Sequence, residues 1–255
     1  MTDDRWAMID DRGSGDPRPW KVSTWGLLGV LLALGYPITA LDGARFTETI
    51  RTEALTRVGT VEMRRLVARD AWFGVTLRGD TLVVSADSVA LTEVADGKSR
   101  RLDTDGFVGG RYRLGLDSTG QATLWQRPFI PNDIADVSDV SRAMDDFFPP
   151  LPPGIPPGGE TADAAGRQWR RFADSAGTQR FRWTMLTSRD TSQVADDTVA
   201  VMMQEETREA SALVWSPTRG PLAWTRQIES DVTTRLRGRT VRATISQHIE
   251  VRRSR

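Results

Sequence analysis

The sequence predicts a mainly β protein: a single N-terminal transmembrane helix followed by a large antiparallel sheet or half-barrel with one amphipathic helix. Three observations support this prediction. The run Val22–Leu41 carries no charge. In the body that follows, apolar and polar residues alternate with a period of two, which is typical of strands with one face on a core. Only residues 132–147 show helical spacing instead.

The uncharged run Val22–Leu41 is expected to cross a membrane once. As an α-helix it would be about 30 Å long, which is the thickness of the hydrocarbon core. A signal peptide cleaved after Ala40 is the alternative. However, the polar tail of residues 1–21 is long for a signal peptide and has no net positive charge, and the bulky Ile38 would stand near the cleavage point. We therefore favour an uncleaved anchor.

The charges beside this anchor indicate its orientation. Basic residues are slightly more frequent before the run than after it, with Arg12, Arg18 and Lys21 on one side and Arg45 and Arg51 on the other. By the positive-inside rule, residues 1–21 are expected in the cytoplasm. Residues 42–255 would then form a periplasmic β-rich domain, attached to a bacterial inner (intracytoplasmic) membrane by one pass.

One face of the predicted helix carries small residues. These are Gly26, Gly29, Ala33, Pro37 and Ala40, at spacings of three and four. Small side chains let another membrane helix approach closely, because lipid provides no hydrophobic drive for association. The expected partners are therefore integral membrane subunits of a larger complex, besides the bilayer itself. The ordinary glycine and alanine content of a membrane helix is the alternative explanation.

The body after Asp42 is expected to contain about ten to twelve strands joined by tight turns. The segments Arg78–Thr81 and Asp117–Gly120 separate apolar runs and are typical of hairpin turns, and Asp96-Gly97 ends another run. The clean alternation along Val241–Val251 predicts a strand with one apolar face. We expect one curved sheet rather than two separate domains.

The exception to this alternation begins at Asn132, a favourable N-cap. An apolar stripe follows at helical spacing, formed by Ile134, Val137, Val140, Met144 and Phe147. The helix should stop at Phe148, because residues 148–159 (FPPLPPGIPPGG) are rich in proline and stiff. This Pro-rich segment is either a domain linker or a strap lying over the sheet.

The composition excludes several classes of function. With 34 basic and 34 acidic side chains the formal charge is zero, so no nucleic-acid partner is expected. The absence of cysteine excludes disulfides, Cys-ligated zinc and a thiol nucleophile. The sequence contains no P-loop, no G-x-S-x-G elbow and no H-E-x-x-H motif. We therefore predict no catalytic residues, no cofactor and no metal, and expect that the protein is not an enzyme.

The candidates for chemistry all have ordinary explanations. His248, the only histidine, has the polar parity of the last strand and is expected on the surface. Three aspartates at helical spacing are more simply explained by the helix dipole than by a cation, namely Asp133, Asp136 and Asp139. Four tryptophans of the second half either pack the core or line a lipid-binding concavity, namely Trp169, Trp183, Trp215 and Trp224.

Two resemblances to known proteins add to this interpretation. The segment FFPPLPPGIPPGG, followed by Gln168-Trp169, resembles uncharacterised β-rich bacterial envelope proteins with an F-P-x-L-P turn before a glycine and a tryptophan. That resemblance implies no catalytic residues. The overall plan is similar to accessory, non-pigment subunits of bacterial photosynthetic reaction-centre–light-harvesting complexes. That resemblance implies a stabilising role at the antenna ring without chemistry of its own.

The sequence thus favours a non-catalytic, membrane-anchored accessory subunit of a larger membrane assembly. The main alternative is a membrane-tethered periplasmic module that binds a lipid or another apolar ligand in the concavity of the sheet. A third hypothesis is an envelope hydrolase that uses serine or carboxylates.

Overall fold

A computed structural model describes residues 35–135, 137–138, 144, 147–196, 199–236 and 239–254, with the backbone alone for residues 193–196, 199–200 and 236. The chain divides into two units, Met1–Ala33 and Leu34–Arg255. All residues that the structure describes belong to the second unit.

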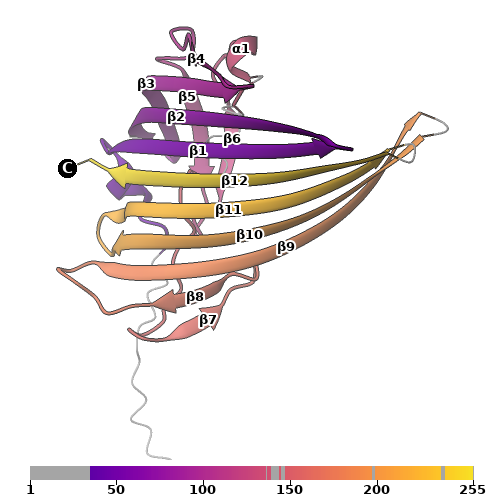
Figure 1. Cartoon of the computed structure of the whole chain (residues 1–255). Coiled ribbons are helices and arrows are strands. Elements are labelled where there is room, and N and C mark those ends of the chain that lie inside the picture. The colour runs from indigo at the N-terminus through magenta and orange to yellow at the C-terminus, as the bar shows by residue number, and fades with distance from the viewer. Residues whose placement is uncertain are drawn as a thin grey trace, which may run out of the picture. The chain divides into compact units, whose positions relative to one another are not determined.

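The described part of the chain forms one antiparallel sheet of twelve strands (Figure 1). The strands are β1 (Arg45–Val58), β2 (Val61–Arg78), β3 (Thr81–Ala95), β4 (Lys98–Leu102), β5 (Arg111–Leu116), β6 (Ala122–Gln126), β7 (Glu160–Ala162), β8 (Gln168–Arg171), β9 (Gln179–Asp196), β10 (Val199–Ser216), β11 (Gly220–Leu236) and β12 (Arg239–Arg253). Their order is β6-β5-β3-β2-β1-β12-β11-β10-β9-β8-β7, and β4 pairs with β3. The predicted mainly β, antiparallel fold is confirmed.

The predicted hairpin turns are also confirmed. Arg78 pairs with Thr81 across the β2–β3 turn, where Gly79 has a φ of +65°. Asp96 and Gly97 both have positive φ values, 51° and 73°, between β3 and β4. Two positive φ values are what a two-residue hairpin turn with the natural strand twist requires, and Asp-Gly adopts them at low cost.

The core lies on one face of this sheet, which we call the inner face. It is the face that packs against the segment between β6 and β7. The Phe147 ring meets Phe46, Phe73 and Trp224 edge to face, at centroid distances of 5.7, 5.2 and 5.8 Å. Edge-to-face pairs bury large apolar area in a favourable geometry. This aromatic cluster therefore joins the segment to β1, β2 and β11.

The predicted amphipathic helix is confirmed only at its start, as α1 (Asn132–Ala135). Four members of the predicted apolar stripe are buried, namely Ile134, Val137, Met144 and Phe147. Val140, the fifth, lies outside the described residues. The stripe therefore faces the core as expected.

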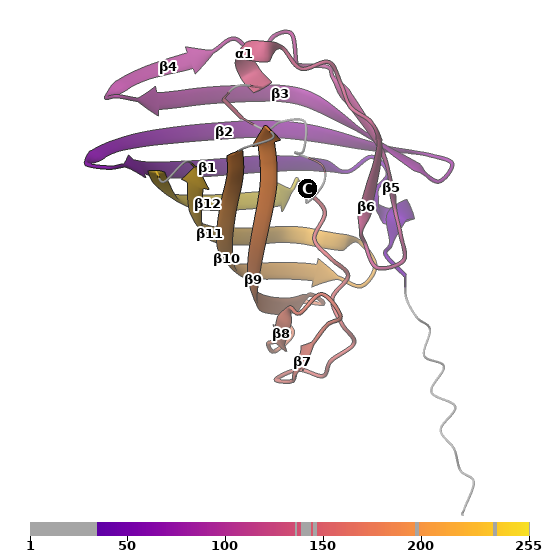
Figure 2. The ribbon, with the colours of Figure 1, turned by 90° about the vertical axis from the view of Figure 1, so that its right-hand side faces the viewer.

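The Pro-rich segment is a strap rather than a domain linker (Figure 2). At its start, the Leu151 amide donates to the Thr119 carbonyl in the β5–β6 turn at 2.8 Å. At its end, the Gly158 amide donates to the Arg171 carbonyl on β8, and the Arg171 guanidinium donates to the Ile155 carbonyl at 2.8 Å. The strap therefore connects elements that lie near opposite edges of the sheet.

The predicted boundary of the membrane helix at Leu41 is wrong. Gly35–Pro37 is not helical, and Ile38–Leu41 forms a short 3-10 helix, η1. Tyr36 and Leu41 are buried, and the Tyr36 ring packs on Trp215 at 5.4 Å. These residues therefore belong to the β domain, which was predicted to begin only at Asp42. Hydropathy alone does not separate apolar residues that enter lipid from those that enter a protein core.

Two of the five residues of the predicted small-residue face are not in a membrane helix. Pro37 and Ala40 lie in the β domain, and the Ala40 carbonyl accepts a hydrogen bond from Arg253 at 2.7 Å. Gly26, Gly29 and Ala33 lie outside the described residues, as do the tail 1–21 and most of the predicted span. Within the residues that the structure describes, no helix has the length and apolar character needed to cross a membrane.

Candidate functional site: the open inner face

Long strands of the sheet, among them β1, β11 and β12, extend past the aromatic cluster (Figure 1). On β1, β12 and β11 the inner face continues past the aromatic cluster, with side chains that are all partly exposed. The register places these side chains in rows across the three strands. We call them the open inner face: Thr52, Ala54, Thr56, Ile228, Ser230, Val232, Thr234, Val241, Ala243, Ile245 and Gln247.

None of these side chains is charged, whereas the opposite face of the same strands is rich in charge. The outward residues there include Glu53, Arg57, Glu229, Asp231, Arg235 and Arg242. Charged side chains flank these residues on the inner face, for example Arg65 opposite Ala54 on β2 and Glu205 opposite Val232 on β10. The open inner face is therefore an uncharged stripe, three strands wide.

Three polar members of the stripe are hydrogen-bonded, two to each other and Ser230 to Thr207 on the neighbouring strand β10. The Gln247 side-chain amide donates to the Thr52 hydroxyl at 3.1 Å, and the hydroxyls of Ser230 and Thr207 lie 2.8 Å apart. A polar group that is already paired has less to lose when water is removed from it. The stripe therefore presents a mostly apolar surface, about 20 Å long at a strand rise of ~3.3 Å per residue.

Buried ion pairs separate this stripe from the core. The Arg69 guanidinium lies 2.9 Å from the Glu48 carboxylate, and their side chains are only 5% and 3% exposed. Arg226 and Glu209 form a similar pair at 2.9 Å. The register puts Arg69 and Arg226 in one row, with Ile50 and Ile249 between them.

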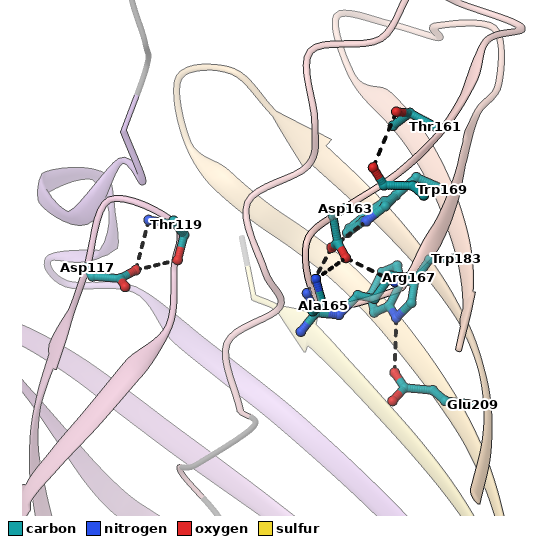
Figure 3. A network of polar contacts seen from close by, with 10 residues as sticks. Asp117, Thr119, Thr161, Asp163, Ala165, Arg167, Trp169, Trp183 and Glu209 are labelled. Carbon is teal, nitrogen blue, oxygen red and sulfur yellow. Dashed lines mark hydrogen bonds and ion pairs between the residues drawn. The ribbon is translucent and has the colours of Figure 1, made fainter. Parts of the chain in front are cut away.

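Glu209 is held by several donors. Its carboxylate accepts from the Trp183 indole at 3.1 Å (Figure 3), from the Ser211 hydroxyl at 2.7 Å and from Arg226 at 3.0 Å. Burial raises the pKa of Glu209, but the hydrogen bonds and charge of Arg226, with Ser211 and Trp183, outweigh it and hold the pKa below its usual value. Glu209 is therefore a charged structural carboxylate.

The four tryptophans considered as ligand-lining residues are buried, so their role in core packing is confirmed. Trp169 stacks on Trp183 with ring centroids 4.7 Å apart. The Trp169 indole donates to Asp163 at 2.9 Å, and Asp163 also accepts from Arg167 (Figure 3). These contacts hold the turn between β7 and β8.

A hollow of about 620 Å³ lies on the outer face, where sequence reasoning placed no site. Its lining includes apolar Leu66, Ala68 and Val94 from β2 and β3, with charged Arg51 and Glu53 from β1. His248 also lines it and is exposed, as predicted. The hollow depends on cross-strand neighbours, so no signal within one segment of sequence indicates it.

The remaining candidates form no site. Asp133 is exposed at α1, and Asp136 and Asp139 lie outside the described residues. Among the residues that the structure covers, no group of metal-ligating side chains comes together.

Comparisons with known proteins give no family for this chain. No family model matches it, and no curated protein matches it. Solved structures that match include the crystal structure of MucB in complex with MucA(peri), at 12% sequence identity over 82% of this chain and 90% of that chain. The TM-score is 0.12, which is too low to transfer either fold or function.

Proposed function

We propose that this protein is a non-catalytic binding module that holds the apolar part of a lipid, or a similarly elongated apolar ligand, on the open inner face. The observation that carries the proposal is the segregation of charge between the two faces of β1, β12 and β11. The predicted anchor before residue 35 and the predicted periplasmic location belong to the same proposal. The module would then work beside a bilayer that contains its ligands.

The dimensions of the stripe suit such a ligand. Three neighbouring strands span about 10 Å, and the stripe is about 20 Å long. This is the shape of one or two extended acyl chains. Burial of apolar surface contributes about 25 cal/mol per Å², so an acyl chain along the stripe would bind without any charged contact.

The carboxylates of the inner face support a non-catalytic role. Glu93 lies between Arg65 and Arg100, at 2.6 and 2.5 Å. Burial raises the pKa of Glu93, but the two arginines outweigh it and lower the pKa below its usual value. Glu93 and Glu209 are thus held as paired anions, which suits neither a general acid nor a free nucleophile.

Photo-crosslinking tests the proposal in the full chain. Membranes that contain the protein are incubated with a diazirine-bearing palmitic acid, irradiated, and the modified peptides are mapped by mass spectrometry. We expect the modifications to fall on residues 52–56, 228–234 and 241–247. Labelling confined to the segment before residue 35, or to the outer face, would contradict the proposal.

A matched pair of variants controls this experiment. Ile245→Arg places a charge in the middle of the stripe, whereas Ser246→Arg places the same charge on the exposed outer face of the same strand. We expect Ile245→Arg to reduce crosslinking at least about tenfold, since a charge buried under an acyl chain costs more than 1.4 kcal/mol. Ser246→Arg should leave it unchanged. Equal effects would indicate nonspecific labelling.

A structural subunit of a larger membrane assembly, such as a photosynthetic reaction-centre–antenna complex, is the second candidate function. It is favoured by the end of the β1–β2 hairpin, where Val58, Val61 and Met63 are 39%, 58% and 47% exposed. These residues extend the apolar face to a tip that a protein partner would cover more readily than a single ligand. Comigration of the native chain with a large complex, lost in Met63→Glu, would support this role.

A further inference from the structure

The edge of the sheet at β9 is long and only partly covered (Figure 1). β9 has 18 residues, but β8 pairs only with residues 181–184 near its start. From Met185 onward, β9 pairs with β10 alone within the described residues. The strands β4, β6 and β7, which also lie at edges, have only five, five and three residues. A short edge strand limits pairing with another chain, so the uncovered part of β9 is the exception.

The backbone groups that this edge exposes can be assigned from its pairing with β8. The Phe172 amide, just after β8, donates to the Arg180 carbonyl at 2.9 Å. The backbone of Arg180 therefore points to the edge, and so does the backbone of every second residue that follows it. Past the end of β8, these residues are Leu186, Ser188, Asp190 and Ser192. Their N–H and C=O groups point away from β10, where the described part of the chain provides no strand.

The side chains along this edge do not prevent a further strand from pairing with it. Native edges are commonly protected by lysine, proline or a bulge. Residues 185–192 (MLTSRDTS) contain neither lysine nor proline, and their register with β10 is regular. Their only charges, Arg189 and Asp190, cancel, and half of the residues are threonine or serine, which pair favourably across strands. A second copy of the same edge is therefore a suitable partner.

We propose that two copies of this chain pair through β9, antiparallel, about a two-fold axis at Thr191. An axis closer to β8 would bring the last residue of the partner's β9 to Thr184, which already pairs with Gln168. An axis at Arg189 or Asp190 would also set like charges face to face, which is destabilising. The axis at Thr191 gives the longest overlap that avoids both conflicts.

This register specifies which residues meet across the axis. The two copies of Thr191 face each other as a non-hydrogen-bonded pair, because their own backbone groups point to β10. Asp190 of each copy stands opposite Ser192 of the other, and these residues exchange backbone hydrogen bonds. The Cα atoms of a non-hydrogen-bonded pair lie about 4.5 Å apart, which is within the range of a disulfide. The proposal does not depend on the open inner face.

The absence of cysteine makes a crosslinking test selective, because an introduced cysteine is the only thiol. The full chain carrying Thr191→Cys, purified in mild detergent, is oxidised with copper–phenanthroline and examined on a nonreducing gel. We expect a disulfide-linked dimer. The matched control is Thr244→Cys, since Thr244 is exposed on β12, an interior strand with β1 and β11 on either side. Equal crosslinking at 191 and 244, or none at 191, would overturn the proposal.

A charge exchange at Ser192 tests the register in the cysteine-free chain. Ser192→Asp sets an aspartate opposite Asp190 twice across the axis, whereas Ser192→Arg sets an opposite charge there. By analytical ultracentrifugation we expect the dimer to dissociate about fivefold more readily in the first variant and about fivefold less readily in the second. Changes in the same direction would overturn the proposal, and so would a different protein crosslinked at position 191. Acyl-chain crosslinking on the inner face is unaffected by any of these outcomes.

Discussion

At the scale of single residues, Glu209 shows how a buried carboxylate on the inner face stays ionised. Its pKa is lower in the folded protein than the ordinary 4.5, because Arg226 and its other donors outweigh burial. A carboxylate of this kind contributes stability above its unfolded pKa, and the contribution disappears as pH falls through the folded pKa. The pKa values of Glu93 and Asp163 are also lowered, so these two carboxylates change the stability in the same direction. We expect the midpoint of thermal unfolding to fall once the pH drops below about 4.5.

Replacement of Glu209 tests its role directly. Glu209→Gln removes the carboxylate that lies 2.9 Å from the Arg226 guanidinium and should cost about 3 kcal/mol in the free energy of unfolding, measured in urea. The control is Glu206→Gln on the exposed side of the same strand, whose pair with Arg208 is solvent-accessible. That variant should cost less than about 1 kcal/mol. Equal losses would show that Glu209 is not a buried structural anion.

Two turn glycines provide a second prediction at this scale. A Cβ atom at Gly120 would stand 2.4 Å from the Tyr36 ring, whereas one at Gly79 meets nothing within 4 Å. Both glycines have positive φ, so alanine costs about 1 kcal/mol at each. Gly120→Ala should lower the unfolding free energy by several kcal/mol more than Gly79→Ala, because Tyr36 must leave its site. Similar unfolding curves for the two variants would contradict the packing of Tyr36.

At the scale of elements, the strap depends on Arg171, which donates to Ile155 and pairs with Asp174 at 2.7 Å. Arg171→Leu removes the side-chain bond but keeps the backbone bonds between the strap and β8. We expect hydrogen exchange of the Gly158 amide to rise about tenfold, since such a bond contributes about 1–1.5 kcal/mol. Arg170→Leu, at the exposed neighbour, should leave it unchanged. Slow exchange of the Gly158 amide in both variants would show that the Arg171 side chain does not stabilise the strap.

At the scale of the whole molecule, the position at which the β domain begins can be measured. A chain that starts at Gly35 should fold with a strand-dominated circular dichroism spectrum. A chain that starts at Asp42 loses the buried residues Tyr36 and Leu41. It also loses the Ala40 carbonyl, which accepts a hydrogen bond from Arg253. We expect the shorter chain to be less stable by at least about 3 kcal/mol in urea. Equal stability would restore the boundary predicted from hydropathy.

The sequence by itself determined the class of the fold, the approximate number of strands and several of their turns. Alternation is a local property, so the apolar parity of Val241–Val251 and the Asp96-Gly97 turn are readable within a few residues. It also indicated an apolar face on each strand. It did not show which strands lie side by side, because cross-strand pairing joins residues far apart in the chain.

The tertiary structure decided the rest. The pairing of β1 with β12 joins residues close to the two ends of the β domain and turns three separate alternations into one uncharged stripe. The strap was ambiguous in sequence, because proline content specifies stiffness but not what the segment contacts. The end of the predicted span was misplaced for a related reason: an apolar residue such as Leu41 gains by leaving water for lipid or for a protein core, and only the three-dimensional contacts distinguish the two.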